Sequence, residues 1–119
     1  MILSKQFEFE AAHKLINYNG KCANLHGHTY KLIVKIEGTP NTASGMIIDF
    51  VEMKKIVNTN VIEKLDHAYT NDLLAQPTAE NIIVWIWNAV KADFEKQNCK
   101  LYELELFETR TSSVIYRGE

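Results

Sequence analysis

The sequence predicts an α+β domain in which an antiparallel sheet of four strands carries two helices on one face. Near both ends of the chain, apolar and polar residues alternate, which is the period of a half-buried strand. In the middle, apolar residues recur every three or four positions, which is the period of a helix. The order is therefore strand, strand, helix, helix, strand, strand. It favours a sheet whose helices are segregated to one face.

The first two strands are expected over residues 6–13 and 26–38. One face of this predicted pair carries the following apolar and histidine residues: Phe7, Phe9, Ala11 and His13, then His28, Tyr30, Leu32, Val34 and Ile36. Asn19-Gly20 is a turn signal between the two runs. The strands are thus expected to form a hairpin with a long, irregular tip that holds Cys22.

Each expected helix begins at a capping residue. Asp49 is the predicted N-cap of the first, with Glu52 at the third helical position, and the helix ends near Leu65. Thr78, directly after Pro77, is the predicted N-cap of the second. The core-facing stripes of the two helices are Phe50, Met53, Val57 and Val61, and Ile82, Ile86, Val90 and Phe94. Two closing strands are expected near 101–108 and 113–117.

Length and charge narrow the class of protein. A chain of 119 residues is expected to form a single domain, 1–119. Its formal net charge is -2, so the composition does not indicate the excess of basic residues that is typical of nucleic-acid-binding proteins. No apolar stretch predicts a membrane span and no signal peptide is recognisable, so a cytoplasmic protein with reduced cysteines is expected. The open edges of so short a sheet predict a homo-oligomer.

Three histidines form the most informative pattern in the chain. Residues two apart on a strand point to the same face of the sheet. His26 and His28 can therefore bind one metal ion, with His13 of the neighbouring strand as a third ligand. Three nitrogen ligands and a vacant fourth position are typical of a catalytic zinc site, although iron and nickel also accept imidazole. The alternative is three core histidines, each hydrogen-bonded to a carbonyl group.

Cys22 lies four residues before His26. Nearby metal and imidazoles would lower its pKa and produce a thiolate that can remove a proton. Two alternatives stay open: a buried, inert cysteine, or a fourth zinc ligand in a closed structural site.

Two further places carry titratable groups. Asp66 precedes His67, and a carboxylate near a histidine can fix its tautomer as in a charge relay. Adjacent side chains seldom bond directly, and a histidine at a helix C-terminus is the alternative. Glu108 shares the apolar parity of its strand with Tyr102, Leu104 and Leu106. It is either solvated beyond the strand end or paired with a bidentate donor, such as the guanidine-like edge of a pterin or guanine.

Together, these motifs resemble the 6-pyruvoyl-tetrahydropterin synthase superfamily from the first strand to the last residue. The matching segments, in order, are Phe9-Glu10-Ala11-Ala12-His13, Cys22-x-x-x-His26-Gly27-His28, Ile48-Asp49-Phe50, Leu65-Asp66-His67, Pro77-Thr78-x-Glu80, Glu108-Thr109 and Ile115-Tyr116-Arg117-Gly118-Glu119. The three residues between Cys22 and His26, and the final four residues, resemble the bacterial 6-carboxytetrahydropterin synthases of the queuosine pathway.

The resemblance implies a tunnelling fold, in which subunits join their sheets into a barrel, as a homohexamer of two trimers with active sites between subunits. It implies that His13, His26 and His28 bind Zn²⁺ and that Cys22 accepts a proton. It further implies that Asp66 and His67 form a charge relay supplied by a neighbouring subunit, and that Glu108 anchors the pterin ring.

The reaction so implied converts 7,8-dihydroneopterin triphosphate to 6-carboxy-5,6,7,8-tetrahydropterin, with release of acetaldehyde and triphosphate. Two alternatives remain. One is a pyruvoyl synthase that eliminates triphosphate only. The other is a non-catalytic, zinc-stabilised oligomeric binding module.

Overall fold

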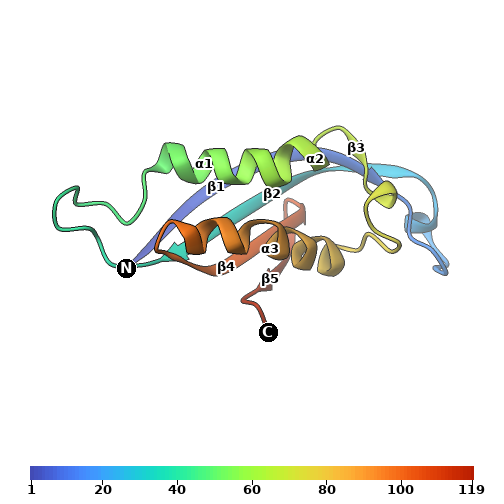
Figure 1. Cartoon of the computed structure of the whole chain (residues 1–119). Coiled ribbons are helices and arrows are strands. Elements are labelled where there is room, and N and C mark those ends of the chain that lie inside the picture. The colour runs from blue at the N-terminus through green and yellow to red at the C-terminus, as the bar shows by residue number, and fades with distance from the viewer.

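The computed structural model describes residues 1–119 and has an α+β architecture (Figure 1). Its strands are β1 (Ile2–His13), β2 (His26–Glu37), β3 (Ala68–Tyr69), β4 (Lys100–Thr109) and β5 (Ser112–Tyr116). Its helices are α1 (Phe50–Val57), α2 (Glu63–Leu65) and α3 (Ala79–Lys96), and a π turn over Asn58–Ile62 joins α1 to α2. Short 3-10 turns cover Lys21–Ala23 and Thr70–Asp72. No helix is both long and apolar enough to cross a membrane.

The sheet has five strands in the order β3-β1-β2-β4-β5. All neighbours are antiparallel except β3, which runs parallel to β1 through Ala11 and Ala12. The prediction of a purely antiparallel, four-stranded sheet is therefore wrong in the number of strands and in the direction of one of them, β3. A strand of two residues has no alternation for a sequence pattern to reveal, and β3 forms because the chain after α2 is bonded to β1.

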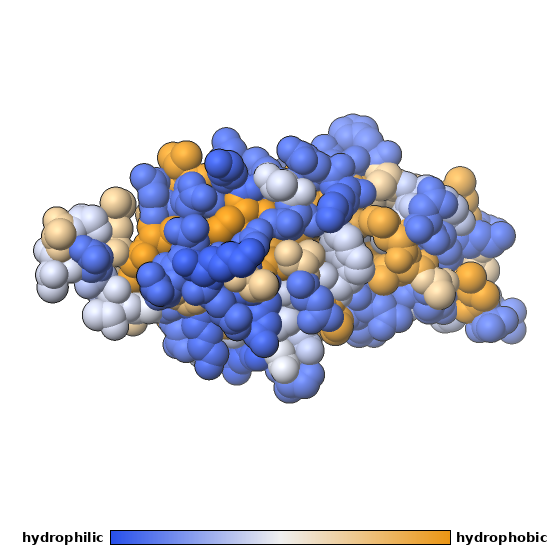
Figure 2. All heavy atoms as spheres, viewed as in Figure 1, coloured by the Kyte–Doolittle hydropathy of each residue, from blue (hydrophilic) through white to orange (hydrophobic).

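Both long helical segments cover the same face of the sheet, as predicted. The buried side chains of β1, β2 and β4 form one core with those of the helices. Its central members are Phe9, Tyr30, Leu32, Val34, Ile36, Leu104 and Leu106 from the sheet, and Met53, Val57, Val61, Ile82, Ile86, Val90 and Phe94 from the helices. Figure 2 shows hydrophilic residues over most of the outer surface of these helices, with hydrophobic residues in the seam between them.

The predicted helix caps are confirmed. The Asp49 carboxylate accepts a hydrogen bond from the Val51 main chain at 2.8 Å, and the Thr78 hydroxyl accepts one from the Asn81 main chain at 3.2 Å. Each satisfies an N–H group that the first helical turn leaves without a partner. Phe50 is the exception in the predicted stripes, because half of its surface is exposed at the first position of α1.

A buried ion-pair network fastens the end of the chain to the sheet. The Glu103 side chain is only 5% exposed, and its two oxygens accept from Lys35 Nζ at 2.8 Å and from Arg117 Nη2 at 2.8 Å. The hydrogen bond from Lys35, with a second from Arg117, holds the pKa of Glu103 below its usual range. The network therefore joins β2, β4 and the segment that follows β5.

This network predicts an acid-sensitive contribution to stability. Because the pKa of folded Glu103 is lowered, its contribution is complete above the unfolded value of about 4.3 and is lost as the pH falls through the folded value. Glu103→Gln should lower the free energy of unfolding by about 1 kcal/mol at pH 7, since Lys35 and Arg117 are partly exposed. Thermal unfolding at pH 7 and pH 3 should show the difference from wild type shrinking in acid. Glu105→Gln, on the same strand, is the control, and an undiminished difference in acid would contradict the assignment.

Candidate metal centre and active site

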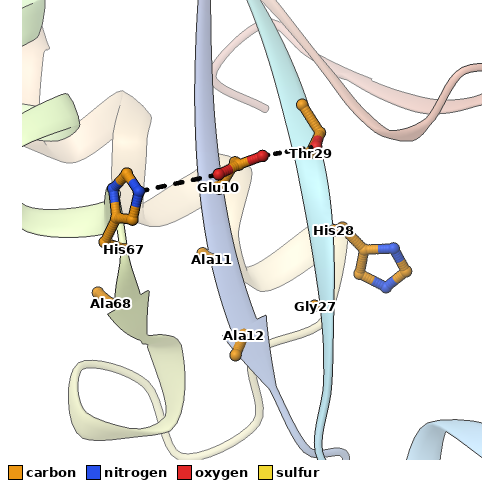
Figure 3. A pocket seen from close by; sticks show the side chains of 8 residues that line it. All are labelled: Glu10, Ala11, Ala12, Gly27, His28, Thr29, His67 and Ala68. Carbon is orange, nitrogen blue, oxygen red and sulfur yellow. Dashed lines mark hydrogen bonds and ion pairs between the residues drawn. The ribbon is translucent and has the colours of Figure 1, made fainter.

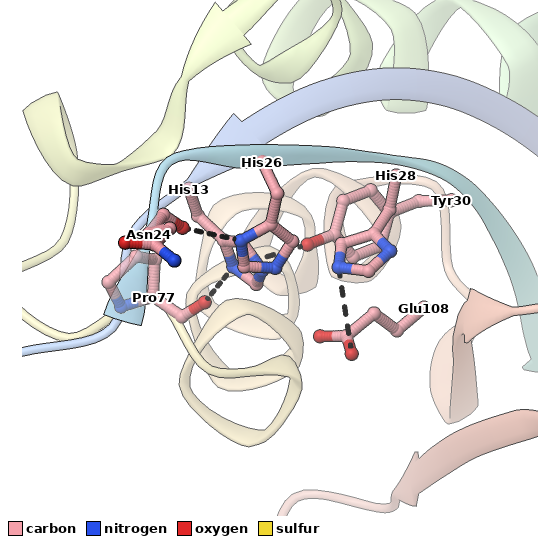
Figure 4. A network of polar contacts seen from close by, with 7 residues as sticks. All are labelled: His13, Asn24, His26, His28, Tyr30, Pro77 and Glu108. Carbon is pink, nitrogen blue, oxygen red and sulfur yellow. Dashed lines mark hydrogen bonds and ion pairs between the residues drawn. The ribbon is translucent and has the colours of Figure 1, made fainter. Parts of the chain in front are cut away.

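Three histidine side chains converge where β1 ends and β2 begins (Figure 4). His13 pairs with His26 across the two strands, and His28 follows two residues later on the same face. Their ring nitrogens offer a set of possible ligand atoms that all lie within 4.8 Å of one another. The pairing of the two predicted strands therefore brings together the three imidazoles that the sequence analysis proposed as metal ligands.

Main-chain carbonyl groups determine which nitrogen of two rings is free. His13 Nδ1 lies 2.7 Å from the Pro77 carbonyl oxygen, and His26 Nδ1 lies 2.7 Å from that of Asn24. A carbonyl oxygen only accepts, so both Nδ1 atoms must donate a proton. Each neutral ring then carries a lone pair on Nε2, and these two Nε2 atoms are 3.0 Å apart.

Two lone pairs at this separation repel each other unless a cation lies between the rings. Metal-bound histidines in proteins usually donate their second nitrogen to a carbonyl or carboxylate group, as His13 and His26 do here. The alternative of three ordinary core histidines explains the Nδ1 contacts but requires a proton shared between the two facing Nε2 atoms. The donor set therefore fits a metal ion.

His28 completes the set with a third free nitrogen. Its Nε2 is buried and has no hydrogen-bond partner, since Glu108 Oε1 is 3.8 Å away. Burial lowers the pKa of His28, Glu108 opposes that shift, and His13 and His26 add to it. A neutral imidazole with a buried, unpartnered nitrogen is the form that binds a metal.

Cys22 lies outside this set. The free, half-buried thiol is on the 3-10 turn Lys21–Ala23, at the tip between β1 and β2, and the set of mutually close ligand atoms contains only the three histidines. The main-chain carbonyl of Cys22 accepts from Leu15 at 2.9 Å, which fixes the turn against the end of β1. Cys22 is therefore outside the set of possible metal ligands, and its role as a base stays a prediction.

Glu108 faces the histidines from β4. The ladder between β4 and β5 is irregular between Phe107 and Thr109, which leaves Glu108 outside regular pairing, and its side chain is 29% exposed. Of the residues expected to share its face, Leu104 and Leu106 are buried as predicted. Tyr102 is not on that face, because a second irregularity opposite Lys35 places Leu101 there instead.

Asp66 and His67 contact each other directly, contrary to the expectation for adjacent residues. Asp66 Oδ1 lies 3.1 Å from His67 Nδ1. The backbone of His67 is left-handed, with φ of 59°. The main-chain N–H of Glu10 donates a hydrogen bond to the Asp66 carboxylate at 2.9 Å. This hydrogen bond is the main reason why the pKa of Asp66 lies below its usual range, and the nearby His67 ring lowers it further.

The Asp66–His67 pair is not part of the histidine cluster of its own chain. Figure 3 shows the His67 ring turned toward Glu10, whereas the His28 ring points away from them. His67 is 76% exposed, beside a cavity of about 440 Å³ lined in part by Glu10, Gly27, Thr29 and His67. Sequence reasoning missed Glu10, which occupies the polar face of β1, and the Pro77 and Asn24 carbonyl groups, which have no side-chain signature.

Comparison with known proteins identifies the family. The profile described as 6-pyruvoyl tetrahydropterin synthase matches residues 2–119. The chain belongs to this family. Within it, the 6-carboxy-5,6,7,8-tetrahydropterin synthase of Haemophilus influenzae is 35% identical, with 97% of each chain covered. The enzyme of the same name from Synechocystis is 38% identical over 97% of this chain and 92% of its own.

Other relatives are named as synthases of the 6-pyruvoyl product rather than the 6-carboxy product. The human 6-pyruvoyl tetrahydrobiopterin synthase is 29% identical, over 98% of this chain and 91% of its own. Among solved structures, the 6-pyruvoyl tetrahydropterin synthase of Caenorhabditis elegans aligns with a TM-score of 0.89 at 26% identity, over 100% of this chain and 96% of that one. Family membership thus indicates a pterin-processing enzyme.

Proposed function

We propose that this chain is a zinc-dependent 6-carboxy-5,6,7,8-tetrahydropterin synthase of queuosine biosynthesis. Its substrates would be 7,8-dihydroneopterin triphosphate and one water molecule, and its products the carboxylated pterin, acetaldehyde and triphosphate. The observation that carries the proposal is the convergence of three imidazole nitrogens with no protein partner for that of His28. The names of the Haemophilus and Synechocystis relatives favour the carboxy product over the pyruvoyl product.

In this proposal His13, His26 and His28 would hold Zn²⁺ through their ring nitrogens. Bound zinc supplies a Lewis acid that acidifies the side-chain hydroxyls of the substrate and the neighbouring C–H bonds. Cys22, on the adjacent turn, removes a carbon-bound proton as its thiolate. Glu108 receives the paired N–H donors of the pterin ring and holds the reacting side chain over the histidines.

His67 would shuttle the proton at Nε2, because Asp66 occupies Nδ1. His67 is exposed and lies apart from the histidine cluster of its own chain, which supports a site completed by two copies of the chain. In such a site the Asp66–His67 pair would serve the Cys22 of a neighbouring subunit. Unpaired sheet edges support such an assembly. The outer side of β1 from Ile2 to Glu10 and the outer side of β5 have no strand beside them. We therefore propose a homo-oligomer with a joined sheet, as a hexamer of two trimers.

Product analysis tests the proposed function. The zinc-loaded protein is incubated with 7,8-dihydroneopterin triphosphate, and the products are identified by mass spectrometry. A 6-carboxytetrahydropterin together with acetaldehyde supports the proposal. A 6-pyruvoyl product would preserve the site and assign the alternative reaction. Unchanged substrate at full zinc occupancy would favour a non-catalytic, zinc-stabilised module.

The role of Glu108 gives a separate prediction. Glu108→Gln keeps the shape of the side chain but removes the charge that receives two N–H groups, so KM should rise about tenfold to a hundredfold. Steady-state kinetics with zinc content measured in parallel checks this, and Glu105→Gln on the same strand is the control. An unchanged KM would contradict the anchoring role.

A further inference from the structure

Glu10 contacts the Asp66–His67 pair at three points. Its main-chain N–H donates to Asp66 Oδ1, and its main-chain carbonyl accepts from the His67 N–H. Its carboxylate Oε2 lies 3.8 Å from His67 Nε2 (Figure 3), whereas Asp66 Oδ1 lies 3.1 Å from the other ring nitrogen, Nδ1. Each ring nitrogen of His67 therefore has a carboxylate near it.

The Glu10 carboxylate is itself held in orientation. Thr29, its cross-strand partner on β2, donates from its hydroxyl to Oε1 at 3.3 Å. This bond leaves Oε2 turned toward His67. The two oxygens thus have different partners, and the arrangement spans β1, β2 and the segment that leads into β3.

The two carboxylates act on different states of the ring. Asp66 accepts the Nδ1 proton in the neutral and in the charged ring, so the Nε2 atom is the one that gains and loses a proton. A neutral ring presents a lone pair at Nε2, which a carboxylate does not attract. A ring protonated at Nε2 presents an N–H group, which a carboxylate stabilises.

We propose that Glu10 is a positioning residue for His67: its Oε2, left free by the bond of Thr29 to Oε1, lies beside Nε2 and fixes the orientation of the ring next to the adjoining cavity. The proposal rests on the proposed function in one respect, the use of His67 as a proton shuttle. The proposal adds Glu10 to the Asp66–His67 relay and gives that residue a physical role, which is to orient the His67 ring. Without the Glu10 carboxylate the ring would keep its contact with Asp66 at Nδ1 but would lose its contact at Nε2.

The test compares Glu10→Gln with Glu8→Gln. Both changes remove one charge from the same face of β1, and Glu8 lies opposite Lys31, away from His67. Glu10→Gln should lower kcat about tenfold, with KM and zinc content within twofold of wild type, because substrate contacts are unaltered. Glu8→Gln should leave all three unchanged. An unaltered kcat in Glu10→Gln would overturn the proposal.

A spectroscopic readout separates this role from a structural one. The chain has four histidines, and only His67 lies outside the proposed zinc ligands, so ¹⁵N-histidine labelling of the zinc-loaded protein reports its ring selectively. The groups paired with His67 are Asp66 and Glu10. In Glu10→Gln the ¹⁵N resonance of Nε2 should shift, while that of Nδ1, which contacts Asp66, stays in place. An unchanged Nε2 resonance would also overturn the proposal.

His67→Asn distinguishes the two levels of failure. If it retains wild-type kcat, His67 is not the shuttle and the proposed function fails at this step, whatever Glu10 does. If it loses activity while Glu10→Gln keeps both the wild-type kcat and the wild-type Nε2 resonance, only the role of Glu10 fails.

Discussion

Replacing Cys22 with alanine is expected to lower kcat about 10³-fold, the usual contribution of a positioned general base, while zinc remains bound. The thiol lies on the 3-10 turn that precedes β2 and is not among the mutually close ligand atoms. Removing it should therefore leave all three imidazoles in place. Metal content by elemental analysis, together with steady-state kinetics, measures both halves of this expectation.

Cys99 provides the matched control. It is the other free cysteine, buried against the end of α3, where its thiol donates to the Phe94 carbonyl oxygen. Cys99→Ala should change stability but not zinc content or chemistry. In the wild type, iodoacetamide should modify Cys22 with zinc still bound. Protection of Cys22 until the metal is chelated, or loss of zinc in Cys22→Ala, would instead assign a closed site with four ligands.

Sequence reasoning succeeded where a single repeated pattern decides the structure. Alternation placed β2 to within one residue, and the caps at Asp49 and Thr78 began α1 and α3 where predicted. The histidine cluster followed from the same source. Once β1 and β2 pair, the parity of His13, His26 and His28 puts all three on one face. Such local rules need no knowledge of distant contacts.

The features that sequence reasoning missed depend on contacts between distant segments. β3 exists because the chain at Asp66 and His67 is bonded to Glu10, 56 residues earlier in the case of Asp66. The irregularity at Lys35 moved Tyr102 off the predicted face, since one extra residue reverses strand parity. The π turn after α1 places Asn60, whose amide donates to Asp93 on α3 at 2.8 Å.

Replacing His26 with alanine should remove both metal and activity. Loss of a residue that only hydrogen-bonds to a metal ligand weakens metal affinity by up to about 100-fold. Loss of one of the three ligands themselves should therefore weaken zinc affinity by more than that. His26 is the sharpest choice among the three. Its Nδ1 bond is to Asn24, two residues away, whereas the 1% exposed His13 also joins β1 to Pro77. His13→Ala would therefore cost folding stability as well as metal.

Two measurements separate metal loss from misfolding in His26→Ala. Zinc raises the Tm of any protein that binds it only when folded, so added zinc should raise the Tm of the wild type and not that of His26→Ala. His67→Asn, which alters the histidine outside the cluster, should keep both the bound zinc and the zinc-dependent rise in Tm. A His26→Ala protein that retained stoichiometric zinc would show that the converging Nε2 atoms are not the ligands, and the proposed mechanism would lose its metal centre.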